Sequence, residues 1–177
     1  MHAISANDGC GLSSELSYYG TPFNEALTEY FTNKTFLKIE EKLPSYLAKE
    51  SKCAYDRMVL LLNEFFEYYE DELKADYLIN GQQKSLTSSA MGNLNFRNLI
   101  NLINHYWILI TSNELLAIIQ DDKEFCRQYE QGLFKNCSKQ NKGLYRDYYD
   151  TVKAIRNSCK KAIERKENIS LQPKKFK

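Results

Sequence analysis

Apolar side chains recur every three or four residues between positions 52 and 79, and this spacing places them on one face of a helix. The face comprises Tyr55, Met58, Val59, Leu62, Phe65, Phe66, Tyr69, Leu73 and Tyr77. Acidic residues such as Glu64, Glu67 and Asp71 occupy much of the opposite face. A helix with one apolar face buries that face against other elements, so the chain is predicted to fold as a packed group of helices.

The same spacing predicts helices in most of the rest of the chain, which holds only three Pro and seven Gly. They begin at Thr21, with Pro22 in the first turn, and continue at residues 35–49, 94–119, 121–129 and 142–167. Pro44 should kink or divide the segment 35–49, and both two short helices and one bent helix fit the pattern. The polar stretch 81–93 is predicted to be a surface loop between the two halves of the chain.

The segment 94–119 is the most apolar part of the chain. Apolar residues occupy every side of it between Tyr106 and Ile110, so this helix is expected to pass through the middle of the domain. Polar residues interrupt it too often for a membrane span, and Ser112 or Asn113 can begin a separate last segment.

We therefore predict an all-α fold, a single helical bundle of about five to seven helices around this central apolar helix. The predicted domain covers residues 21–168, between a flexible lead-in at 1–20 and a basic tail at 169–177.

Charge is distributed unevenly along the chain. Residues 139–177 contain twelve Lys and Arg against four Asp and Glu, whereas the preceding residues contain twelve against nineteen. The last helix should therefore carry a basic face, and like charges gathered on one element create a local field that a partner can recognise.

Residue types needed for most enzyme sites are scarce. The chain has only two histidines, His2 and His105, and no phosphate-loop, dinucleotide-binding or zinc-ligand spacing. Glu64, Glu67 and Asp71 share a helix face, but the Glu-x-x-His pairs of di-iron bundles are absent, so this face is interpreted as solvated. No catalytic residue, cofactor or metal ligand is predicted, and a non-enzymatic role is favoured.

The five cysteines are odd in number and include no Cys-x-x-Cys pair, which favours free thiols in a reducing compartment. A Cys126–Cys137 bridge is the alternative for an oxidising compartment. Residues 1–11 lack the apolar core of a secretory signal, so a cytoplasmic location is expected, with secretion after removal of a signal as the other case.

The exposed face of the last helix is the main candidate for partner binding. Its candidate residues are Arg146, Tyr149, Lys153, Arg156, Lys160 and Lys161. Three interpretations fit this face: a solvated face that complements the acidic helix at 52–79 or simply keeps the protein soluble, a face that binds an acidic protein, or one that binds nucleic acid or an anionic membrane. Nucleic acid is disfavoured because the sequence pI of about 7.6 is well below that of typical nucleic-acid-binding domains.

The leading functional hypothesis is a protein–protein interaction module, of the adaptor or pathogen-effector kind, that uses this basic face with the abundant Tyr and Phe. The alternative is a small-molecule or catalytic site inside the bundle near His105, Tyr106 and Trp107. A second alternative is nucleic-acid binding through the last helix. The pattern does not indicate an oligomeric state.

Overall fold

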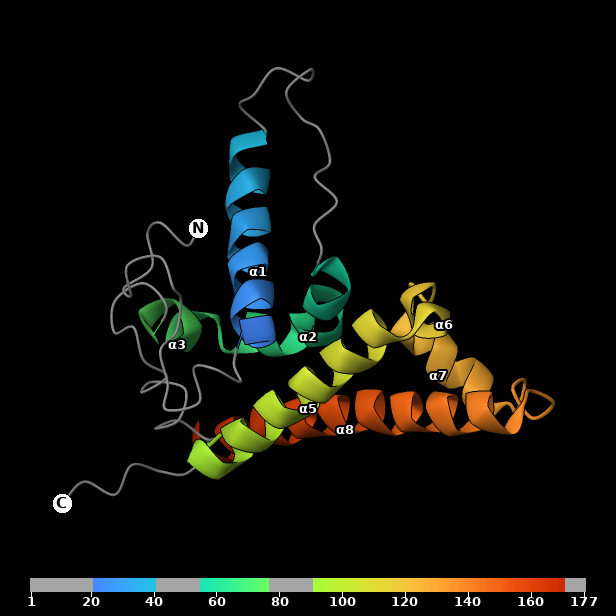
Figure 1. Cartoon of the computed structure of the whole chain (residues 1–177). Coiled ribbons are helices and arrows are strands. Elements are labelled where there is room, and N and C mark those ends of the chain that lie inside the picture. The colour runs from blue at the N-terminus through green and yellow to red at the C-terminus, as the bar shows by residue number, and fades with distance from the viewer. Residues whose placement is uncertain (1–20, 41–54, 77–90, 171–177) are drawn as a thin grey trace.

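The computed structural model describes residues 21–40, 55–76 and 91–170, and within these ranges it contains seven helices and no strand. The predicted all-α bundle is thus confirmed (Figure 1). The predicted lead-in at 1–20 and residues 81–90 of the predicted loop at 81–93 lie outside these ranges, and Asn93 at the end of that loop is the first residue of a helix. No helix in the described part of the chain combines the length and the apolar character needed to cross a membrane.

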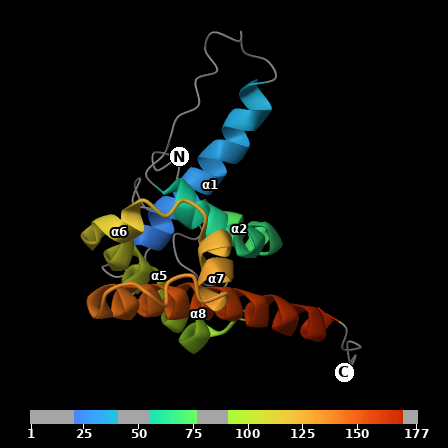
Figure 2. The same ribbon diagram turned by 90° about the vertical axis from the view of Figure 1, so that its right-hand side faces the viewer.

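Helix α1 (Thr21–Glu40) is continuous, whereas the sequence pattern suggested a new segment from residue 35. The stretch after Phe31 contains no Gly or Pro to end the helix, and the hydroxyls of Thr28, Thr32 and Thr35 each donate to a backbone carbonyl four residues earlier. The first turns of α1 pack on the other helices, and its C-terminal half extends away from them (Figures 1 and 2). Pro44 lies outside the described residues.

The predicted helix at 52–79 is interrupted at Tyr69, which separates α2 (Asp56–Tyr68) from α3 (Glu70–Lys74). Tyr69 has φ −103° and ψ 20° and so leaves the helical conformation. Its side chain is fully buried, and its hydroxyl donates to the carbonyl of Ala162 on the last helix at 2.9 Å. We attribute the interruption to this tertiary contact, because neither Gly nor Pro is nearby.

Helix α5 (Asn93–Ser112) ends at Asn113, whose backbone is extended (φ −132°, ψ 106°), and the short helix α6 (Glu114–Ala117) follows. The predicted separate last segment is confirmed. Helix α5 packs against α1 and against α8 (Lys139–Ser170), which it crosses in the opposite direction (Figure 1). Its central position is confirmed, but one side is open, since Ile108 is 57% exposed.

Helix α7 (Asp122–Glu130) packs on α8, as Figure 2 shows. The Asp121 carboxylate accepts hydrogen bonds from the backbone N–H groups of Lys123 and Glu124, which caps the first turn as the acidic start of this segment predicts. Helix α8 begins three residues before the predicted start at 142 and extends past 167 to Ser170, into the predicted tail.

Aromatic rings join the helices in the core. Phe23 of α1 packs edge-on against Phe66 of α2 and Phe96 of α5, with ring centroids 5.6 and 5.5 Å apart. Phe125 of α7 packs in the same manner on Tyr148 of α8, at 4.8 Å. Edge-to-face pairs of this kind stabilise a core by roughly 0.5–1.5 kcal/mol beyond the burial of their area.

Ion pairs connect α1 to α3. The Glu70 carboxylate pairs with Lys34 of α1 and, at 2.5 Å, with Lys74 of its own helix. Hydrogen bonds from these two lysines lower the pKa of Glu70 to about 2. The Glu70 carboxylate therefore stabilises the attachment of α1 as long as it is ionised.

Candidate functional site

A buried polar network surrounds the first residue of α7. The Asp122 side chain is only 6% exposed, and it accepts hydrogen bonds from Arg57 Nε at 3.1 Å, from the Tyr106 hydroxyl at 2.9 Å and from the Tyr148 hydroxyl. The Arg57 guanidinium also donates to the Leu116 carbonyl at 2.7 Å and to the Tyr148 oxygen. The network thus joins α2, α5, α7 and α8 at one point.

The protonation states of this network follow from its burial. Burial, together with the nearby Asp122 carboxylate, raises the pKa of Tyr106 and of Tyr148 well above the ordinary value of a phenol. Both hydroxyls therefore keep their protons and remain donors. Because Arg57 supplies the balancing positive charge, a carboxylate that would be costly to bury alone is accommodated in the core.

A first hollow opens beside this network, at the N-terminal end of α7. Its volume is about 240 Å³. Its lining consists of Arg57, Leu60, Leu61, Gln120, Asp121, Asp122, Lys123 and Arg156. Two arginines from different helices thus meet at one opening, next to an apolar wall from α2.

A second hollow of about 490 Å³ opens at the C-terminal end of α7. It is lined by Tyr129, Glu130, Gly132, Phe134, Lys135, Lys142, Tyr145 and Arg146. The Phe134 ring lies 4.9 Å from that of Tyr145 and 6.4 Å from that of Tyr129, so the aromatic rings form one continuous wall. Gly132 has a φ of +77°, the left-handed conformation that lets the chain turn after α7.

The only acid among these lining residues is already engaged. Glu130 accepts a hydrogen bond from the Tyr149 hydroxyl at 2.5 Å and lies 3.6 Å from Lys153 Nζ. The Tyr149 hydrogen bond, with the charge of Lys153, lowers the pKa of Glu130. The net charge around the second hollow is therefore positive at neutral pH.

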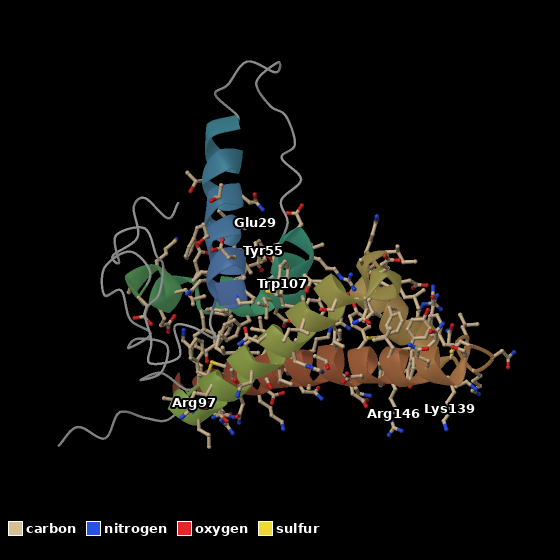
Figure 3. The ribbon with its side chains drawn as sticks, in the orientation of Figure 1. Glu29, Tyr55, Arg97, Trp107, Lys139 and Arg146 are labelled. Atoms are coloured by element: carbon tan, nitrogen blue, oxygen red, sulfur yellow. The ribbon has the colours of Figure 1, made fainter. Side chains whose placement is uncertain are left out.

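The structure distributes the predicted partner-binding residues over four places. Arg146 lines the second hollow and Arg156 lines the first, while Tyr149 and Lys153 bind Glu130 between them. Lys160 is exposed and lies 3.8 Å from Glu164 of its own helix, and Lys161 is exposed as well. Figure 3 shows Arg146 extending outward from the N-terminal half of α8.

Pairing between the basic helix and the acidic helix is limited in the described part of the chain. There, one ion pair joins them, between Lys166 of α8 and Glu72 of α3. Other contacts of the basic face, such as Lys153 with Glu130, are made with α7 instead. Much of the basic face of α8 remains exposed to solvent.

The residues of the alternative pocket contact three different partners. The His105 ring lies 3.1 Å from the Asp147 carboxylate on the surface, whereas the Tyr106 hydroxyl points into the core network. Trp107 stacks on Tyr55, with centroids 4.6 Å apart, and the Tyr55 N–H donates to Glu29 (Figure 3). The three consecutive side chains thus point in different directions around α5.

Sequence reasoning missed Arg57 and Asp122. Asp122 resembled an ordinary acid in the first turn of a helix, and Arg57 lies in the predicted amphipathic helix without being assigned a role. The available signal was the position of Arg57, which directly precedes the apolar pair Met58–Val59 and is one turn before Leu61 and Leu62. An Arg at the edge of an apolar face is a candidate for a buried ion pair, because arginines that become buried are almost always paired.

The cysteines and the acids show no metal-binding arrangement within the described ranges. Cys126, Cys137 and Cys159 are free thiols, and burial raises the pKa of Cys159 to about 12. No three His, Cys, Asp or Glu side chains in these ranges gather as a metal site would require.

Comparisons of this chain with known protein families, with curated proteins and with solved structures found no match.

Proposed function

We propose that this protein is a protein–protein interaction module, which binds an acidic segment of its partner in the aromatic and basic hollow at the C-terminal end of α7. The observation that carries the proposal is the combination of a continuous aromatic wall with three cationic side chains at one opening, those of Lys135, Lys142 and Arg146. A large apolar side chain of the partner would occupy the hollow, and flanking carboxylates would face the three cations.

Charge complementarity determines the kind of partner. Lys135 and Lys142 are exposed and have no ion-pair partner among the described residues. Arg146 is 76% exposed and lies 3.7 Å from Asp150, a distance typical of a weak surface pair. Since Glu130 is held by Tyr149 and Lys153, the hollow has free positive charge and no free negative charge to oppose an acidic segment.

The arrangement of the rings favours a protein over nucleic acid. Tyr129 stacks on Tyr149 with centroids 4.5 Å apart, and Phe134 stacks on Phe125 at 5.1 Å. In each pair one face of the ring is covered by its neighbour, which reduces the ring area on which the bases of single-stranded nucleic acid could stack. A cavity with apolar walls and a cationic rim suits an apolar side chain flanked by acids.

A peptide display selection on the full chain tests this proposal. Selected peptides should contain Asp or Glu next to one large apolar residue. Lys142→Glu should weaken the binding of a selected peptide by about tenfold or more, since it replaces an attractive charge with a repulsive one. Lys161→Glu, which makes the same charge change on the exposed face of α8 away from the hollow, should leave binding within about twofold.

Two results would count against the proposal. The first is equal weakening by Lys142→Glu and Lys161→Glu, which would indicate a general charge effect. The second is binding of a single-stranded oligonucleotide at low salt that is lost in Lys142→Glu while no peptide is selected. That outcome would assign the hollow to nucleic acid instead.

A further inference from the structure

The first hollow, at the N-terminal end of α7, is lined by a positive charge, that of Arg156, with no ion-pair partner among the described residues. Arg57 is bound on one side by Asp122, Leu116 and Tyr148, and its side chain is 15% exposed toward the hollow. Arg156 lines the same hollow from α8 and has no hydrogen-bond or ion-pair partner among the described residues. Buried or half-buried arginines are usually paired, so this guanidinium is available for a ligand.

We propose that this hollow binds a small oxyanion, the chemistry shared by phosphate monoesters and carboxylates, with Arg156 as its principal ligand and the Arg57–Asp122 ion pair as a fixed wall behind it. Guanidinium groups recognise such anions through paired N–H donors. The core network holds the Arg57 side chain in one position, so that part of the site is organised before any ligand arrives.

The acids in the hollow do not cancel this preference. Asp122 accepts from Arg57, Tyr106 and Tyr148 and is therefore already balanced. Asp121 is occupied in capping α7, through Lys123 N–H at 2.8 Å and Glu124 N–H at 3.0 Å. The cap also closes the N-terminus of α7 to an anion, so the binding charge comes from Arg156 and Lys123, which together outweigh the one remaining negative charge, that of Asp121.

The apolar wall limits the ligand further. Leu60 and Leu61 line the hollow beside the arginines, and Leu60 is 72% exposed. A volume of about 240 Å³ suits an anion with a short hydrocarbon or single-ring portion. This site is separate from the second hollow, because the two are lined by opposite ends of α7.

Titration of the isotopically labelled full chain with inorganic phosphate, phenyl phosphate and isovalerate, followed by NMR at constant ionic strength, tests this assignment. Saturable shifts are expected at the amides of residues 57–61, 120–123 and 156 with at least one of the three anions. Phenyl phosphate should bind more tightly than inorganic phosphate because its ring can contact Leu60 and Leu61. Binding of the phosphates without isovalerate would identify a phosphate site, and the reverse would identify a carboxylate site.

Three variants separate binding from folding. Arg156→Gln should weaken anion binding by about tenfold or more, since it removes charge-assisted hydrogen bonds. Lys161→Gln removes an equal charge from an exposed position on the same helix and should leave binding unchanged. Leu60→Ser should weaken phenyl phosphate but not inorganic phosphate, and circular dichroism should show that all three variants are folded. Shifts that do not saturate, or equal affinity in Arg156→Gln and the unaltered chain, would overturn the proposal.

Discussion

Replacing Asp122 with alanine is expected to destabilise the fold by about 4 kcal/mol, because the change leaves a buried guanidinium without its counter-charge. Removal of one partner from a buried ion pair costs roughly 3–5 kcal/mol. The Arg57 and Asp122 side chains, 15% and 6% exposed, belong to that class. The substitution also removes the acceptor of the Tyr106 and Tyr148 hydroxyls, which costs about 1 kcal/mol for each hydrogen bond. Part of this cost is already included in the value for the ion pair.

Urea unfolding monitored by circular dichroism measures this loss. With an m-value of about 2 kcal/mol/M, the expected midpoint shift is about 2 M, a large part of a total stability of roughly 5–15 kcal/mol. Asp150→Asn is the matched control, since Asp150 is 61% exposed and only 3.7 Å from Arg146. Its effect should stay within about 0.5 kcal/mol.

A double variant tests whether the unpaired charge of Arg57 causes this loss of stability. Arg57→Met combined with Asp122→Leu removes both charges at once and should recover at least half of the stability lost in Asp122→Ala, because no unpaired charge remains buried. A loss below about 1 kcal/mol in Asp122→Ala would refute the reasoning outright, since it would mean that the network contributes little to holding the four helices together.

Three further predictions concern other contacts. Glu70→Gln should lower the free energy of unfolding by about 1 kcal/mol at pH 7, a value reduced for the exposure of Lys34. The pKa of Glu70 is about 2 in the folded protein against an ordinary 4.5. Unfolding curves should therefore show the difference between the two proteins disappearing as the pH falls from 4.5 toward 2. Tyr69→Phe should cost about 1 kcal/mol in the same unfolding assay, because it removes the buried hydrogen bond from the Tyr69 hydroxyl to the Ala162 carbonyl. In peptide mapping after brief alkylation of the native chain, Cys137 should react before the buried Cys159, whose thiol has a pKa of about 12, and equal labelling would contradict the described burial.

Local patterns predicted the helices well because amphipathic spacing is a property of neighbouring residues. The helix start at Thr21, the acidic cap of α7 and the break at Asn113 all follow from residues within one turn of each other. The interruption at Tyr69 was not predictable in this way, since its cause is a contact with Ala162, far along the chain.

The candidate sites were only partly predictable for the same reason. The sequence indicated a basic and aromatic surface on the last helix, because residues three, four and seven positions apart share a helix face. Arg146, Tyr149 and Lys153 have this spacing. Sequence spacing contained no information on how α7 lies across α8, and that packing decides which of these side chains line a hollow and which are held by Glu130. The association of Arg156 with Arg57 depends on the same packing.

By itself, the sequence determined that this chain forms helices with apolar faces and a basic last helix, because these properties follow from side-chain type and spacing along the chain. Only the tertiary structure decided where the charges meet. Asp122 and Arg57 are 65 positions apart, and their pairing exists because the core brings α2 and α7 together. That packing buries one ion pair between α2 and α7 and leaves Arg156 beside it, lining an open hollow.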